Sequence, residues 1–445
     1  MPVAITTLAT EPTSDFLKNE LGKPDVAHLA ADPYRVLRVA TDYMDLGLYR
    51  PSLELLERAY PTVPTEQTEP GSVLPQAHIM VRYYAAYCRS KLGMDADPSW
   101  REAARLSTAL VVPSTAMDSE VLEAALQANP SDATAHYLLG TLLFSKGMYD
   151  QGISHWTEAQ RLDPKLPVVD VDLGRAWLDL KHDPQQALPY FQRALENDRL
   201  NPAVYVGLDE ALSLTSVPPS ERESALSRYP DADSPHSTMP ESLTYELALT
   251  RAETAKFRQA EELFQGRFFA SEEGGITSDE VLLEVELLQA EAEAQSGDYS
   301  AAKALLAGDL ARLSKNGASS QGYFRMAMVA KACGDPDQAT TLLENATHAH
   351  RFADRVWAYM AMNSMGSADA PRAFQELEKL LPADAASIDI HSYTSYHWYG
   401  LGLLQRALNQ PDQAMHSFQN ALMLPDEWMA HHLSRIAMQQ IKAHP

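Results

Sequence analysis

Residues 391–400, HSYTSYHWYG, bring together side chains that could bind a metal ion, stack on a sugar or pack in an ordinary helix. His391 and His397 are the two histidines of this stretch, and they stand six positions apart. In a helix this separation turns them about 240° away from each other, so they cannot hold the same ion. The metal reading is therefore excluded, while stacking and packing stay open.

The spacings typical of nucleotide binding, acyl transfer and zinc hydrolysis are also missing. The chain has no GxxxxGK[ST], no GxGxxG, no GxSxG and no HExxH. Its two cysteines, Cys88 and Cys333, are far apart and form no CxxC pair. We therefore expect no catalytic residues, no cofactor and no metal ion, which favours a protein that is not an enzyme.

The chain is strongly acidic: its 445 residues include 60 Asp and Glu against 36 Lys and Arg, a net charge of −24. A field of this sign repels phosphate backbones and anionic lipids, so we expect no nucleic-acid partner. No run of about 18 apolar residues occurs, so we expect no membrane insertion. The first basic residue is Lys18 and no apolar signal segment precedes it, which predicts a cytoplasmic protein.

An internal repeat organises much of the chain. In residues 133–164 a glycine, an aromatic residue and a closing proline fall at Gly140, Trp156 and Pro164. The same positions recur at Gly174 and Phe191, one period of about 34 residues further on. A small residue on one helix lets the aromatic ring of the next helix approach closely, so the pattern predicts pairs of packed helices.

This register resembles the tetratricopeptide repeat. The resemblance implies an all-α solenoid of helix-turn-helix units in a right-handed superhelix, here of about nine helical pairs. Breaks in the pattern predict an N-terminal extension (1–31), an N-terminal repeat lobe (32–215), a Pro-rich connector (216–240) and a C-terminal repeat lobe (241–445).

The resemblance also sorts the aromatic residues of the opening stretch. Trp398 takes the fourth position of a first helix and is expected in the core. Tyr396 and Tyr399 take the second and fifth positions, which line the inner groove of such a superhelix, and we expect Tyr399 to be exposed there. The candidate groove residues are Tyr137, Phe144, Arg175, Tyr245, Phe324, Tyr396, Tyr399 and Arg406. The alternative is that several of these side chains are core residues between repeats.

A second resemblance covers residues 32–310, including DPYRVLRVATDYMDLGLY and RFFASEEGG. These stretches are similar to the C-terminal half of large, uncharacterised bacterial proteins in which a β-sandwich module related to galactose mutarotases precedes a tetratricopeptide tail. The β-sandwich module is absent here. The loop that carries over is either an interface or ligand loop or a solvated connector. Its residues are Arg267, Phe268, Glu272, Glu273, Gly274 and Gly275.

The sequence thus predicts a non-catalytic scaffold that binds a protein or peptide partner in its concave groove. Tetratricopeptide proteins that bind chaperone tails use Lys and Asn, but the matching positions here hold Tyr137 and Thr141, so we expect no chaperone-tail binding. The alternative function is the tail or accessory subunit of a carbohydrate-active bacterial enzyme, in contact with a β-sandwich catalytic module or a glycan.

Overall fold

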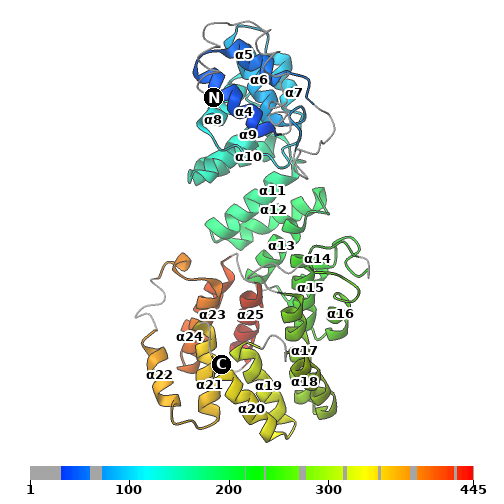
Figure 1. Ribbon diagram of the computed structural model, residues 1–445, viewed down its shortest axis with the longest axis vertical. Coiled ribbons are helices and arrows are strands. Elements are labelled where there is room, and N and C mark those ends of the chain that lie inside the picture. Colours follow the sequence, from blue (N-terminus) through cyan, green and yellow to red (C-terminus); the bar gives the residue numbers. More distant parts are fainter. Residues whose placement is uncertain are drawn as a thin grey trace, which may run out of the picture. The chain divides into compact units, whose positions relative to one another are not determined.

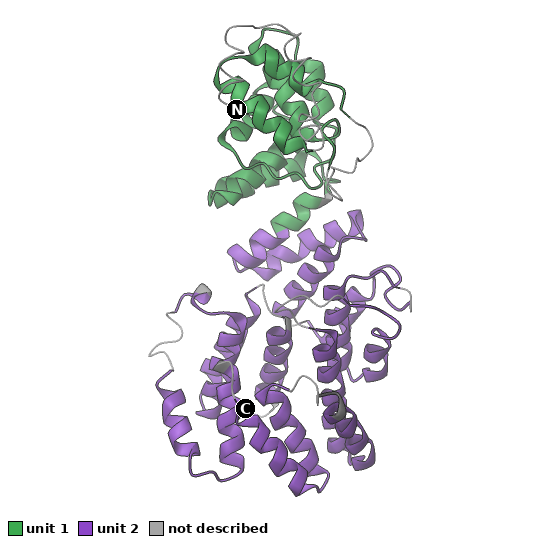
Figure 2. Cartoon of the chain, in the orientation of Figure 1, with its two compact units in different colours: residues 1–173 green, residues 174–445 purple. Residues whose placement is uncertain are grey.

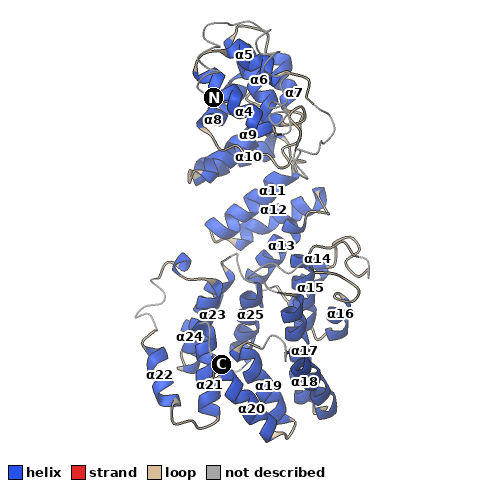
Figure 3. Ribbon diagram, viewed as in Figure 1, coloured by secondary structure: helices blue, strands red, loops and turns tan. Residues whose placement is uncertain are grey.

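The structure is a computed structural model that describes residues 32–60, 73–215, 217–234, 237–269, 277–313, 318–348, 352–380, 388–424 and 428–443. These residues form 22 α-helices and no strand (Figure 3). The predicted all-α fold is confirmed. The expected extension, residues 1–31, lies outside the described residues.

The chain divides into two compact units, residues 1–173 and 174–445 (Figure 2). Helix α11 (Pro167–Arg175) crosses this boundary. The other helices of the first unit are α4 (Pro33–Asp45), α5 (Tyr49–Leu56), α6 (Ile79–Lys91), α7 (Asp97–Ala103), α8 (Ala116–Ala128), α9 (Ala133–Ser145) and α10 (Tyr149–Leu162).

The second unit begins with a π-helical turn, Ala176–Leu180, that continues α11. A short 3-10 turn, Ile390–Ser392, precedes α23. The α-helices of this unit are α12 (Pro184–Asn197), α13 (Pro202–Leu214), α14 (Pro219–Leu226), α15 (Glu241–Glu253), α16 (Phe257–Glu262), α17 (Ser278–Ser296), α18 (Tyr299–Leu313), α19 (Ser320–Ala332), α20 (Pro336–Ala346), α21 (Phe352–Ser364), α22 (Ala370–Glu378), α23 (Ser395–Ala407), α24 (Pro411–Leu422) and α25 (Trp428–Ala443).

Local sequence explains where the second helix of a pair begins. Asp183 precedes the first-turn proline of α12, and its Oδ1 accepts a hydrogen bond from the backbone N–H of Gln186 at 3.1 Å. Asp335 caps α20 in the same way. Such side chains satisfy backbone donors that the first turn of a helix leaves free. The connecting turn often needs a left-handed residue, which Gly147 supplies with φ +80°.

Helices within a pair approach closely because glycine leaves room for an aromatic ring. A Cβ atom on Gly140 would lie 2.6 Å from Cδ1 of Trp156, and one on Gly402 would lie 2.5 Å from Cε1 of Phe418. Both rings are buried. The predicted packing of a small residue against an aromatic one is confirmed at these positions.

Eighteen of the described α-helices form nine pairs of consecutive, contacting helices, in line with the nine predicted. Helix α12 contacts the π-helical turn that continues α11, while α8 and α25 have no second helix. In the second unit the first helices of successive pairs contact each other in series, from α15 through α17, α19, α21 and α23 to α25. Helix α25 also contacts α15, so the series returns to its beginning (Figure 1). This closure positions the site described below.

The segment predicted as a connector, residues 216–240, lies inside the second unit and includes α14. The division into lobes at this segment stays a prediction.

Candidate partner-binding face

Helix α15 presents carboxylates on one side. Glu246 and Glu253 are seven residues apart, two helical turns, so both side chains point in the same direction. Asp209 from α13 and Glu284 from α17 lie in the same cluster through shared ion-pair partners. We call the carboxylates of Asp209, Glu246, Glu253 and Glu284 the acidic face.

Arg222 of α14 neutralises one end of the acidic face. Its side chain is 1% exposed, and its Nε and Nη2 donate to the two carboxylate oxygens of Asp209 at 2.9 and 2.6 Å. Nη2 also donates to Glu246 at 3.2 Å, and Nη1 lies 3.6 Å from Glu253 Oε2. Burial opposes the charged form of Arg222, but the surrounding carboxylates raise its pKa above the usual value. The fork geometry of a guanidinium suits such bidentate pairing.

Arg325 of α19 plays the same part at the other end. Its Nη1 donates to both oxygens of Glu284 at 2.7 and 2.8 Å, while Nε and Nη2 donate to Glu291 at 2.7 and 2.8 Å. A buried charge is tolerated when it is paired and hydrogen-bonded in this manner.

Helix α25 supplies the remaining cations. His432 and Arg435 are three residues apart and share one side of this helix. Arg435 Nη2 donates to Glu246 Oε1 at 3.0 Å, and its Nε donates to Glu253 Oε1 at 3.3 Å. His432 Nδ1 lies 2.9 Å from Glu253 Oε1, and its Nε2 lies 3.6 Å from Glu284 Oε1. A helix is therefore bound on the acidic face through charge.

The pKa shifts follow from this arrangement. Burial would raise the pKa of Glu253, but the charges of Arg435, His432 and Arg222 outweigh it and bring the pKa to about 2. Burial opposes protonation of His432, but its hydrogen bond to Glu253 and the nearby charge of Glu284 raise its pKa. Glu246 differs, because burial raises its pKa to about 7 against the opposing charge of Arg435.

The adjacent His431 behaves in the opposite way. Burial lowers its pKa to about 4, and its Nε2 lies 2.6 Å from the carbonyl oxygen of Leu424. The ring is therefore neutral at pH 7 and serves as a hydrogen-bonding group.

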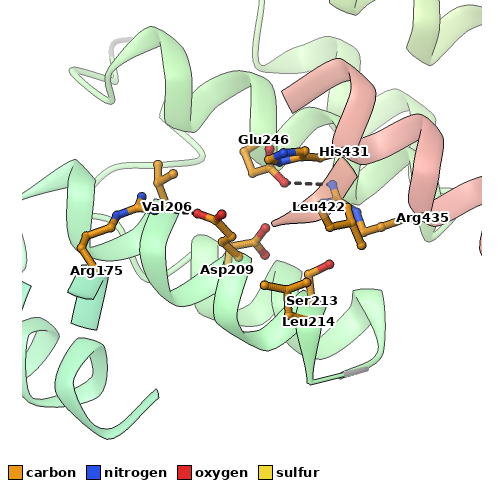
Figure 4. Close-up of a pocket in the computed structure, with 10 residues that line it drawn as sticks. Arg175, Val206, Asp209, Ser213, Leu214, Glu246, Leu422, His431 and Arg435 are labelled. Atoms are coloured by element: carbon orange, nitrogen blue, oxygen red, sulfur yellow. Dashed lines mark hydrogen bonds and ion pairs between the residues drawn. The ribbon is translucent and has the colours of Figure 1, made fainter. Parts of the chain in front are cut away.

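A small polar cavity of about 40 Å³ lies beside Arg435, between α13 and α15 on one side and α24 and α25 on the other (Figure 4). Glu210 Oε1 and Ser213 Oγ, both lining it, are buried atoms with no hydrogen-bond partner. Arg175 Nη1 donates to the other carboxylate oxygen of Glu210 at 2.6 Å. Burial raises the pKa of Glu210 to about 7. A space of this size accommodates a few water molecules and no larger ligand.

Three predicted groove tyrosines are buried. Tyr399 is 2% exposed, and its hydroxyl donates to Gln321 Oε1 at 3.2 Å. The expectation that Tyr399 is exposed is therefore wrong. Tyr137 and Tyr245 are buried as well, and the Tyr245 ring lies 5.9 Å from that of Phe264. The physical reason is that these rings pack against aromatic side chains of the second helix region of their own pair: Tyr399 lies 6.0 Å from Phe418 of α24, as Tyr245 lies beside Phe264 after α16.

The other predicted groove residues are half-buried. The ring of Phe144 stacks on Trp156 at 4.7 Å, and that of Phe324 packs against Trp357 at 5.4 Å. Arg406 Nη1 donates to Gln440 Oε1 of α25 at 2.8 Å. A predicted groove donor is thus already bound to α25. The remaining members of this set are Arg175, which lines the cavity, and Tyr396.

Two further expectations have different outcomes. Trp398 is buried and its Nε1 donates to the carbonyl oxygen of Ile390 at 2.8 Å, so its core position is confirmed. In the second resemblance's loop, Arg267 donates to the carbonyl oxygen of Met239, and Phe268 is 92% exposed. Glu272, Glu273, Gly274 and Gly275 lie outside the described residues.

Sequence reasoning missed the acidic face. Glu246 and Glu253 look like two of many carboxylates in an acidic chain, and His432 looks like one of two adjacent surface histidines. The separations of seven on α15 and three on α25 were available signals. The contact between the helices joins residues about 180 positions apart, however, and no local pattern encodes that pairing.

Comparison with known proteins identifies solved structures to which this chain is similar. No protein-family model and no curated protein matches this chain. The described residues form an all-α fold of paired helices with glycine-to-aromatic contacts. The solved structures that are similar to this chain include tetratricopeptide repeat proteins. Among the described residues no group of three or more His, Cys, Asp or Glu side chains could hold a metal ion, and no described helix combines the length and apolar character needed to span a bilayer.

Similar solved structures include YrrB, described as a tetratricopeptide protein with an unusual peptide-binding site, at 12% identity and TM-score 0.32; the match covers 58% of this chain and 100% of YrrB. A tetratricopeptide protein from Parabacteroides merdae matches at 13% identity and TM-score 0.35, covering 70% of this chain and all of that one. Yeast Tom70 matches at 14% identity and TM-score 0.33; the match covers 96% of this chain and 91% of Tom70.

Proposed function

We propose that this chain is a tetratricopeptide repeat protein and acts as a non-catalytic scaffold that binds a protein or peptide partner on the first helices of its repeats. One observation carries the proposal: α25 is bound against α15 and α23 through Arg435, His432 and Gln440. A surface built from these helices therefore accepts a helix as a ligand within the same molecule. Helix-in-groove binding is a recurring mode of peptide recognition.

The chemistry of the acidic face supports binding. Its carboxylates are matched with guanidinium and imidazole groups at hydrogen-bonding distance, which fixes orientation and register between two surfaces. The neighbouring cavity of about 40 Å³ has no room for an organic substrate. We place the scaffold in the bacterial cytoplasm, following its acidic composition, its two free cysteines and its resemblance to bacterial proteins.

A second candidate function is the accessory subunit of a carbohydrate-active enzyme. The observation that favours it is the ring of Phe268, a residue of the loop that the second resemblance shares, which is 92% exposed. Exposed aromatic rings are suited to contact with a partner module or the apolar face of a sugar. Recovery of a β-sandwich protein or a glycan with the chain, lost in Phe268→Ser, would support this candidate.

A photo-crosslinking experiment tests the scaffold proposal. A photoreactive phenylalanine replaces Tyr396 on α23, and a matched control replaces Tyr299, which is exposed on α18. Each chain is irradiated in a lysate of its native host, and crosslinked proteins are identified by mass spectrometry. We expect the photoreactive residue at position 396 to capture one partner protein reproducibly, and the one at position 299 not to capture that protein. Equal capture at both positions, or none at either, would contradict the proposal.

A further inference from the structure

We infer that α25 occupies a helix-binding site of its own chain, and that the site also takes a partner helix carrying a histidine followed three residues later by an arginine. This inference deepens the proposed function and rests on it. The partner helix would replace α25 on the acidic face.

The first argument is the charge of the site without α25. Helices α13, α15 and α17 contribute five carboxylates: Asp209, Glu246, Glu253, Glu284 and Glu291. Helices α14 and α19 contribute two guanidinium groups, those of Arg222 and Arg325. The excess is negative and buried, and unpaired buried charge is strongly unfavourable. Whatever helix occupies this place must therefore bring cations.

The second argument is the geometry that the cations must meet. The guanidinium of Arg435 reaches two carboxylates at once, with Nη2 3.0 Å from Glu246 and Nε 3.3 Å from Glu253. One turn earlier on α25, His432 lies between Glu253 and Glu284. Two adjacent donors of one planar group, Nε and Nη2, are required at the arginine position. Lysine, a single point charge on a flexible stem, does not reproduce this.

The third argument is the packing between α25 and the acidic face. The cavity of about 40 Å³ beside Arg435 is lined by the polar atoms Glu210 Oε1 and Ser213 Oγ, which make no hydrogen bond to another residue, and it has room for a few water molecules. Protein interiors are close-packed, and buried polar atoms are nearly always satisfied. Beside Arg435, the charges of α25 and of the acidic face are therefore complementary, but their side chains do not fill all the space between the two surfaces. A helix with the same cations and a larger side chain beside them would fill the space that α25 leaves.

A peptide-binding measurement on the full chain tests the inference. Arg435→Gln removes the bridging guanidinium and should weaken the hold on α25. Lys442→Glu changes the charge of an exposed residue on the same helix and is the matched control. A fluorescent peptide with the sequence of residues 428–443 is titrated into each chain and followed by anisotropy. His432→Asn is a second loosened variant, used if Arg435→Gln loses its helical circular dichroism.

We expect the loosened chain to bind one peptide at least tenfold more tightly than the parent and Lys442→Glu chains, because its own helix competes less. A peptide in which lysine replaces the residue equivalent to Arg435 should bind about tenfold more weakly. Equal peptide affinity of the Arg435→Gln and Lys442→Glu chains would overturn the inference. So would equal affinity of the arginine and lysine peptides for the Arg435→Gln chain. Exchange of α25 between two copies of the chain, with no binding of the peptide, would also overturn it. Failure of the scaffold proposal is distinguishable, since the peptide would then bind while crosslinking at Tyr396 captured no partner.

Discussion

The ring of Phe191 lies between two glycines, and this arrangement gives a quantitative prediction. A Cβ atom on Gly207 of α13 would lie 2.4 Å from Cε1 of Phe191, and one on Gly174 would lie 2.8 Å from Cζ. The ring is fully buried and has no solvent space into which it can retreat. Glycine is therefore required on both sides of the ring. Gly174 allows the close approach of α11 to α12, and Gly207 allows that of α12 to α13 of the next pair.

We expect Gly207→Ala to lower the free energy of unfolding. Overpacking costs about 1–3 kcal/mol, while the better helix propensity of alanine returns about 1 kcal/mol. The net loss is about 0–2 kcal/mol. Gly308→Ala on α18 is the matched control, because a Cβ atom there meets nothing within 4 Å. It should stabilise the protein by up to about 1 kcal/mol through helix propensity.

The decisive comparison is a double-mutant cycle with Phe191→Leu, which removes the ring atoms that clash. Urea unfolding followed by circular dichroism at 222 nm gives the four free energies. We expect Gly207→Ala to cost at least about 1 kcal/mol less in the Phe191→Leu background, since contacting residues are energetically coupled. If Gly207→Ala stabilises the chain as much as Gly308→Ala, or if the cycle is additive, the assigned glycine-to-aromatic packing is wrong.

Three further outcomes follow from the same structure. Trp398→Ala and Tyr399→Ala should each lower the free energy of unfolding by about 3–5 kcal/mol in urea titrations, because both side chains are buried. An unchanged free energy of unfolding in Tyr399→Ala would show that this side chain is exposed. Phe268→Ser should change it by less than about 0.5 kcal/mol, since the ring is exposed. The free energy of unfolding should fall as pH rises from about 7 to 9. The pKa of His432 is raised and that of Glu246 is raised to about 7, so the folded state binds more protons than the unfolded state and loses this advantage as the pH rises. A melting temperature that rises over this range would contradict the assignment.

Contacts within a repeat could be predicted from the sequence, and contacts between distant repeats could not. Gly140 and Trp156 are 16 residues apart in one helix pair, and the size of the two side chains encodes their contact. Trp398 was placed in the core by the same register. Tyr399, one position later, depends on how closely neighbouring repeats pack, and the register carries no information on that spacing.

The acidic face shows the same limit more strongly. Each of its carboxylates sits on an α-helix, but the closure that brings α25 back to α15 depends on rotations summed over the four helix pairs from α17 to α24. Small differences in rotation accumulate along a solenoid. The sequence therefore predicts that Glu253 lies on a helix, but it does not predict which residues pair with it.

The contact between α15 and α25 is the central claim, and a double-mutant cycle between Glu253→Gln and His432→Asn tests it most directly. These residues are 179 positions apart, and Glu253 Oε1 lies 2.9 Å from His432 Nδ1. We expect a coupling free energy on the order of 1–3 kcal/mol from urea unfolding at pH 7, because each single variant removes the same buried, charge-assisted hydrogen bond. The control cycle, Glu253→Gln with Lys442→Gln, should show no coupling beyond about 0.5 kcal/mol. A coupling near zero between Glu253 and His432 would show that α25 is not bound on the acidic face.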